Sequence, residues 1–205
     1  LNSVADTPEL RAAYNAALPR VTEFWTRLGS SEALYAKYKA IDPTSLNAEQ
    51  RQAHRNALRN FVLGGAELQG PAKARYAAIQ ERQAEVAQKF SENTLDATDR
   101  FTLYVAPSEL AGVPQDVVDA ACAAAEQDGH PGQAKLGLKL PSYLPVMQFA
   151  DNRGLRERLY RAYTTRASDQ AEGQARQYDN TALMQEILAL RQEKARLLGY
   201  AHFAQ

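Results

Sequence analysis

The sequence predicts a mainly α-helical fold with a small β-sheet. Apolar residues recur at three- and four-residue steps along most of the chain, as on one face of a helix. Strand-like patterns are confined to two short segments, near residues 101–105 and 134–140. The chain has 205 residues, of which 45% are hydrophobic, and these suffice for a sizeable core. We expect residues 1–205 to form a single helical lobe.

The first helix is expected to start at Thr7-Pro8-Glu9, where a capping hydroxyl precedes a proline whose missing N–H costs nothing. Its apolar stripe consists of Leu10, Tyr14, Ala17, Val21, Trp25 and Leu28. Pro19 lies inside this stripe and is expected to kink or interrupt the helix. A short second helix is expected after Gly29-Ser30-Ser31.

Two longer helices are expected next. Asn47 and Gln50 have the spacing of a capping box at the start of one of them. Gly70-Pro71 opens the other, the longest in the chain, and its apolar stripe consists of Tyr76, Ile79, Val86 and Phe90. Gln83 and Asn93 interrupt the stripe, and we interpret both as polar groups with hydrogen-bond partners in the core.

The strand candidates are FTLYV (101–105) and AKLGLKL (134–140), with an alanine-rich helix from Pro114 to Gln127 between them. In the second candidate, leucines alternate with Lys135, Gly137 and Lys139. We expect the buried face to carry Leu136, Leu138 and Leu140, and the two strands to pair.

Pro141 and Pro145 are expected to end the second strand, and two helices should follow. Asp151-Asn152 caps the first of these, and Asp179-Asn180 caps the last helix of the chain. Apolar residues of the last helix spread around much of its circumference, which predicts an exposed apolar patch near residues 187–203.

Charge and composition exclude several partner classes. Lys and Arg total 24 and Asp and Glu total 24, so no net field concentrates a polyanion or an anionic membrane surface. No apolar run has the length of a transmembrane helix. We therefore expect neither nucleic acid nor a membrane as a partner. The single cysteine, Cys122, forms no internal disulfide and indicates a reducing cytoplasm.

Local motifs provide no catalytic or metal site. His54, His130 and His202 lie far apart, and the sequence contains no HExxH, no CxxC pair, no EF-hand loop and no phosphate-binding glycine loop. We therefore predict no catalytic residue, no metal ligand and no cofactor in this chain.

The run at residues 151–169 contains five arginines, which scatter around a helix at about 100° per residue. Three interpretations stay open: a solvated face whose arginines pair with acids, a set facing a cleft or another domain, and a weakly supported nucleic-acid surface.

Five ordered blocks resemble a known family: LNSVADTPELRAAYNAALP, SENTLDAT, LPSYLPVMQFADN, LRERLYRAYTTRASD and EILALRQEKARLLGY. They are similar to the thimet oligopeptidase-like family of zinc metallopeptidases, in its bacterial oligopeptidase A branch, and the resemblance covers residues 1–205. In that family two mostly helical lobes flank a narrow channel above a zinc site on a HExxH helix. That helix lies C-terminal to the matched blocks.

The resemblance implies a fragment of the N-terminal half of a cytoplasmic, zinc-dependent oligopeptidase that cleaves short peptides. The chain would form one wall of the substrate channel, contact the remaining lobes of the same polypeptide and be inactive alone. Arg161, Tyr163, Arg166 and Asp169 are the residues expected to contact the channel or another lobe. The alternative is a stand-alone helical protein-interaction module without enzymatic activity.

Overall fold

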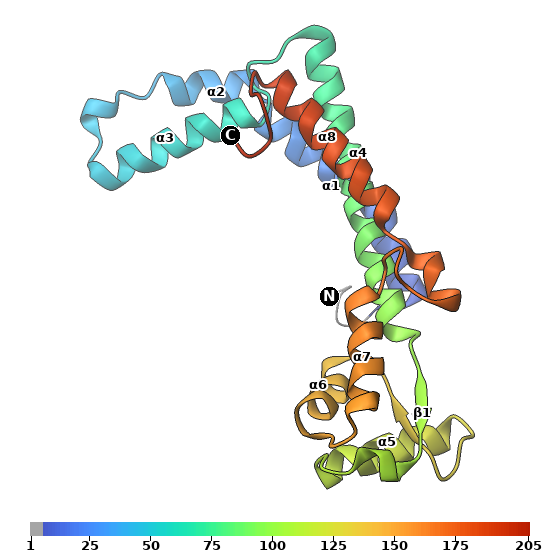
Figure 1. The fold of residues 1–205 in the computed structure, drawn as a ribbon. Helices are drawn as coiled ribbons and strands as arrows, with labels where there is room; N and C mark the ends of the chain where they lie inside the picture. The colour runs from blue at the N-terminus through green and yellow to red at the C-terminus, as the bar shows by residue number, and fades with distance from the viewer. Residues whose placement is uncertain (1–5) are drawn as a thin grey trace. The chain divides into compact units, whose positions relative to one another are not determined.

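The computed structural model describes residues 6–205 and confirms a mainly α-helical fold with a small two-stranded sheet (Figure 1). The chain divides into two compact units. The first comprises Leu1–Gln88 and Leu183–Gln205, and the second comprises Lys89–Ala182. The single lobe across residues 1–205 stays a prediction.

Helices make up the first unit. Its elements are α1 (Pro8–Gly29), α2 (Glu32–Lys39), the 3-10 turn η1 (Pro43–Ser45), α3 (Ala48–Leu63), the first part of α4 (Gly70–Asp99) and most of α8 (Thr181–Leu197). α1, α4 and α8 lie side by side, and α2 packs against α3 (Figure 1).

The expected start signals act as helix caps. The Thr7 hydroxyl accepts a hydrogen bond from the Leu10 amide at 3.2 Å. Asn47 and Gln50 form the predicted capping box, with reciprocal bonds of 2.8 and 3.0 Å. The helix continues through Pro19, so the expected interruption does not occur, and the alternative of a kink stays a prediction.

Two exposed ion pairs form a seam between α4 and α8, and α4 also carries buried apolar residues. Ile79 and Val86 of α4 are 0% and 1% exposed. Arg75 binds Glu193 through two nitrogens, at 2.6 and 2.7 Å, and Arg82 binds Glu186 in the same way, at 2.6 and 3.0 Å. Each exposed pair adds at most about 1 kcal/mol, but two-point contacts of this kind define the register of the helices.

The ends of α1 and α3 meet backbone to backbone at Gly29 and Gly64. A Cβ atom on Gly64 would lie 2.6 Å from the Gly29 carbonyl oxygen. A Cβ atom on Gly29 would lie 4.0 Å from its nearest neighbour, which is ordinary contact. A side chain is therefore excluded on the α3 side of this junction and tolerated on the α1 side.

The second unit packs helices against a short antiparallel sheet. Its elements after α4 are β1 (Leu103–Val105), the 3-10 turn η2 (Pro107–Leu110), α5 (Gln115–Gln127), β2 (Ala134–Leu136), α6 (Leu140–Phe149), α7 (Arg153–Thr165) and the 3-10 turn η3 (Gly173–Tyr178). Leu103 pairs with Leu136, and Val105 pairs with Ala134. The core includes Val105, Leu136, Leu138, Val146, Leu155 and Leu159. Both predicted strands are present, in shorter form.

The predicted end of the second strand is wrong. Leu136 and Leu138 are 1% and 2% exposed as expected, but Leu140 is 58% exposed and begins α6. Pro141 and Pro145 lie inside that helix. Pro141 lies in the first turn of α6, where the missing N–H of proline has no partner to lose. The leucine alternation therefore continues past the strand into the start of the helix.

A buried pair of asparagines links α4 to the segment that precedes α8. The Asn93 amide donates to Asn180 Oδ1 at 2.9 Å, and the Asn180 amide donates to the Phe90 carbonyl at 3.1 Å. Asn93 is 5% exposed and Asn180 is 1% exposed. The interpretation of Asn93 as a partnered core residue is confirmed.

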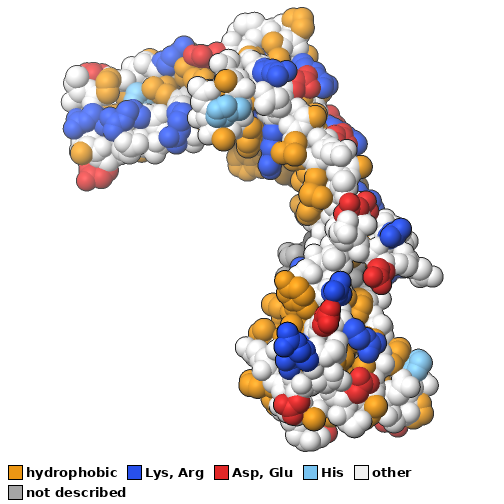
Figure 2. All heavy atoms as spheres, viewed as in Figure 1, with side chains coloured by type: hydrophobic (Ala, Val, Ile, Leu, Met, Phe, Trp, Pro, Cys, Tyr) orange, Lys and Arg blue, Asp and Glu red, His pale blue; other side chains and the backbone are white. Residues whose placement is uncertain are grey.

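Large apolar side chains stay exposed on both units. On α1 they are Tyr14, Val21, Phe24, Trp25 and Leu28. The last helix exposes Leu188, and Phe203 after it is also exposed, as its all-round apolar pattern predicts. Figure 2 shows hydrophobic side chains reaching the surface around α6 and α7, where Leu140, Leu144 and Tyr160 are exposed.

We predict that Gly64→Ala lowers the free energy of unfolding by about 1–3 kcal/mol, because the added methyl group must displace backbone. Gly29→Ala is the matched control and should change it by less than about 1 kcal/mol. Urea denaturation followed by the fluorescence of Trp25, the only tryptophan, measures both. Equal effects of the two substitutions would contradict the described junction.

Candidate functional site: an aromatic stack and a lysine pocket

Two of the four residues singled out in the arginine-rich run come together in the second unit. The ring of Tyr163 on α7 stacks on Tyr143 of α6, with centroids 4.2 Å apart and planes at 13°. The Arg166 guanidinium also lies over the Tyr163 ring, 3.8 Å from its centroid. We call these three residues the Tyr–Tyr–Arg stack. Burial raises the pKa of Tyr143, and the neighbouring tyrosine Tyr163 raises it further.

Arg166 has a buried donor without a partner among the described residues. Its Nη1 donates to the carbonyl of Tyr163. Its Nε is buried and has no hydrogen-bond partner within residues 6–205. A buried donor without a partner costs about 1–3 kcal/mol.

Arg161 and Asp169 lie outside the stack. Arg161 pairs with Glu157 one helical turn away at 2.9 Å, and both side chains are exposed. Such a pair is worth about 0.3–0.5 kcal/mol. Asp169 is exposed and makes no ion pair with any described residue. A contact of these four residues with a channel or another lobe stays a prediction.

The histidines do not form a zinc site. Among residues 6–205, no group of three or more His, Cys, Asp or Glu side chains could hold a metal ion. His54 Nε2 hydrogen-bonds the Tyr38 carbonyl at 2.7 Å, and His130 stacks on Tyr104 with centroids 3.8 Å apart. Catalytic zinc needs three protein ligands and an open position, so the described residues do not fit it.

A polar cluster beside His130 is satisfied internally. The Tyr104 hydroxyl donates to Asp128 at 2.6 Å, and Lys135 pairs with the same carboxylate at 2.5 Å. Lys135 and then Tyr104 lower the pKa of Asp128, while Asp128 raises the pKa of Tyr104. The cluster holds the end of α5 against the two strands. This structural role explains why these polar residues lie together.

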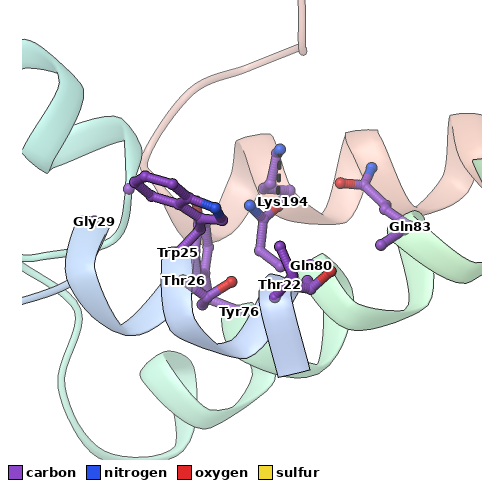
Figure 3. Close-up of a pocket in the computed structure, with 11 residues that line it drawn as sticks. Thr22, Trp25, Thr26, Gly29, Tyr76, Gln80, Gln83 and Lys194 are labelled. Carbon is purple, nitrogen blue, oxygen red and sulfur yellow. Dashed lines mark hydrogen bonds between the residues drawn. The ribbon is translucent and has the colours of Figure 1, made fainter. Parts of the chain in front are cut away.

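The first unit contains a pocket of about 430 Å³ between α1, α4 and α8 (Figure 3). The glycine junction contributes to its lining. The lining residues are Val21, Thr22, Trp25, Thr26, Gly29, Gly64, Tyr76, Gln80, Gln83, Ala84 and Lys194. No Asp or Glu is among them. We call this cavity the Lys194 pocket.

Lys194 is the cation of the pocket. Its ammonium donates to Gln80 Oε1 at 3.1 Å. Burial lowers the pKa of Lys194, and the nearby charge of Arg191 lowers it further. The Phe203 ring lies 5.4 Å from the same ammonium, which is therefore held in a partly desolvated position.

Two aromatic residues line the same cavity. Trp25 is 62% exposed, so most of its indole is free for contact with a ligand. Tyr76 is buried, and its hydroxyl donates to the Leu63 carbonyl at 2.8 Å. Burial raises the pKa of Tyr76. Trp25 is therefore available to a ligand, and Tyr76 fixes α4 against the end of α3.

The pocket could not be found from local sequence. Gln80 and Lys194 lie 114 positions apart, and packing alone brings them together. One signal was present: Gln83 interrupts an apolar stripe. Gln83 is half-buried and has no hydrogen-bond partner among the described residues, so its interpretation as a partnered core residue is wrong.

Comparison with known proteins gives the family. The family model described as the neurolysin/thimet oligopeptidase N-terminal domain matches residues 1–73, and the model described as peptidase family M3 matches residues 146–205. Oligopeptidase A of Salmonella typhimurium is 46% identical over 209 aligned residues that cover 100% of this chain. The chain belongs to peptidase family M3.

Further oligopeptidase A relatives show similar identity over the whole chain. Oligopeptidase A of Escherichia coli is also 46% identical over 209 residues, and a probable cytosolic oligopeptidase A of Arabidopsis thaliana is 39% identical over 216 residues. Both alignments cover 100% of this chain. The chain spans 30% of the length of each of these relatives, the Salmonella protein included. Within residues 6–205, no helix has both the length and the apolarity that a membrane span requires.

We predict that Tyr163→Leu lowers the free energy of unfolding by about 1–2 kcal/mol, because it removes both the ring stacking and the cation–π contact. Tyr163→Phe keeps the ring and should cost less than about 0.5 kcal/mol. Chemical denaturation followed by circular dichroism gives both values. A loss of similar size in the two variants would assign the stabilisation to the hydroxyl and contradict the stack.

Proposed function

We propose that this chain is part of a zinc-dependent oligopeptidase, a metalloendopeptidase that cleaves short peptides, and that it forms one wall of the substrate channel. The observation that carries the proposal is the 46% identity to oligopeptidase A across the whole chain. The match of two M3-related models to its two ends supports the same assignment.

This chain and the rest of the polypeptide would have different roles in the enzyme. Since the described residues hold no metal-binding group, zinc and the residues that bind it would come from elsewhere in the parent protein. Bound zinc would supply a polarised carbonyl and a water of lowered pKa. The contribution of this chain is steric: packed helices beside the channel admit short, unfolded peptides and exclude folded proteins.

The remaining partners follow from the same proposal. They are short peptides and the other lobes of the same polypeptide. A cytoplasmic location is supported by the word cytosolic in the name of the Arabidopsis relative. The exposed apolar side chains of α1 outside the Lys194 pocket, such as Tyr14, Phe24 and Leu28, favour a surface that another protein segment covers.

The same exposed face supports the second candidate, a stand-alone interaction module without enzymatic activity. The two candidates differ in what the chain does when joined to a peptidase. A channel wall must pack against a catalytic lobe and support its activity, whereas an interaction module is not expected to do so.

We predict that a chimera of Escherichia coli oligopeptidase A, with its matching segment replaced by residues 1–205, cleaves a quenched fluorescent peptide within about tenfold of the parent rate. A tenfold change corresponds to about 1.4 kcal/mol, which a wall with 46% identity can lose at its contacts. The chain alone should cleave nothing, with or without added zinc, and should bind no stoichiometric zinc. The control for both measurements is the parent enzyme, assayed with and without a zinc chelator.

Two outcomes would contradict the proposal. One is chelator-sensitive cleavage by the purified chain. The other is a chimera that folds and binds zinc but has no peptidase activity, which would favour the interaction module.

A further inference from the structure

The Lys194 pocket contains more hydrogen-bond donors than the protein uses. Elsewhere in the chain, helical threonine hydroxyls donate to the carbonyl one turn earlier, as Thr94 and Thr98 do at 3.0 and 2.8 Å. The hydroxyls of Thr22 and Thr26, which line the pocket, make no hydrogen bond to any described residue. The Gln83 amide, which also lines it, is without a partner in the same part of the chain. These groups are free to bind a ligand.

The charge of the pocket is unbalanced. Glu186 and Glu193, the acids of α8 that face α4, are taken by Arg82 and Arg75. Lys194 makes no ion pair with a described carboxylate, and its ammonium uses one hydrogen bond, to Gln80. A partly desolvated cation is stabilised by an anion placed beside it. The missing partner is therefore negatively charged.

The rest of the lining is apolar or aromatic. Val21, Trp25 and Ala84 line the cavity beside the polar groups, and Figure 3 shows Trp25 and Lys194 on different helices of the same pocket. A cavity of about 430 Å³ lies in the range of small-molecule sites, about 300–1,000 Å³. A ligand that matches this lining carries one anionic group and one apolar or aromatic group.

We propose that the Lys194 pocket binds a free carboxylate that is attached to an apolar or aromatic side chain, the chemistry of a peptide C-terminus or of a free amino acid. Lys194 would pair with the carboxylate, the unused donors of Thr22, Thr26 and Gln83 would satisfy the remaining polar atoms, and Trp25 would contact the side chain. Lipid and nucleotide anions fit less well, because a single lysine is the cation and no arginine lines the cavity.

The inference goes beyond the proposed function and concerns binding by this chain alone. Peptide hydrolysis releases a new carboxyl terminus at each cleavage, so the ligand class would be a product of the proposed reaction. Binding can be measured without zinc or catalysis, and its failure would leave the peptidase assignment standing.

The test titrates the 205-residue chain with N-acetyl-phenylalanine and with its uncharged amide, following Trp25 fluorescence. We expect the acid to bind with a Kd of about 1–10 mM, and the amide to bind at least about tenfold more weakly, because the charged hydrogen bond to Lys194 is lost. N-acetyl-alanine should also bind more weakly than the aromatic acid. Free phenylalanine and a dipeptide ending in phenylalanine then distinguish the two sources of the carboxylate.

Two variants of α8 assign the site. Lys194→Met should weaken binding of the acid about tenfold or more and leave the weak binding of the amide unchanged. Arg196→Met removes a charge from the exposed side of the same helix and should leave both unchanged. Circular dichroism verifies the fold of each variant. Equal binding of acid and amide, absence of binding at 50 mM (about five times the upper end of the expected Kd range), or an unchanged affinity in Lys194→Met would overturn the proposal.

Discussion

The backbone contact between Gly29 and Gly64 is the constraint on which the first unit depends. It brings the end of α1 against the end of α3, and the same point receives α4 because Tyr76 donates to the Leu63 carbonyl. Gly65 has a left-handed φ of 83°, and the Tyr76 ring occupies the space that a side chain there would need. α1 and α3 therefore meet through their glycine backbones, and the Tyr76 side chain joins α4 to the same point.

The pocket is a consequence of this junction and of the way polar groups are paired around it. Arg75 and Arg82 of α4 form ion pairs with Glu193 and Glu186 of α8. Lys194 makes no ion pair with a described carboxylate. The second unit follows the opposite pattern. Asn93 donates to Asn180 and Asn180 donates to the Phe90 carbonyl in the core, and the Asp128 carboxylate on the surface pairs with Lys135. Thr22, Thr26 and Gln83 of the pocket have no such partner among the described residues.

Local signals predicted most of the fold. The capping box at Asn47 depends on residues three positions apart, and the stack of Tyr163 and Arg166 also lies within one turn, so both could be anticipated from the sequence. The end of the second strand could not. Leu140 continues a perfect alternation, and proline both ends strands and begins helices, so the pattern alone cannot choose between the two.

The candidate site was hidden for a different reason. In the sequence, Thr22, Gln80 and Lys194 read as ordinary polar residues of their own helices. Their meeting depends on helix packing over long sequence separations, as between Gln80 and Lys194. Family membership does not reveal the pocket either, because a family name says nothing about which side chains face a cavity.

The ion pairs between α4 and α8 also make this seam responsive to acid. Hydrogen bonds from Arg75 and Arg82 lower the pKa of Glu193 and of Glu186, so each carboxylate takes up a proton less readily in the folded chain than in the unfolded chain. Their contribution to stability is complete above the unfolded pKa and is lost as the pH falls through the lowered folded value. Proton uptake would then release both arginines from α8, the helix that carries Lys194. Acidification therefore removes the two ion pairs between α4 and α8, the helices that supply two sides of the Lys194 pocket.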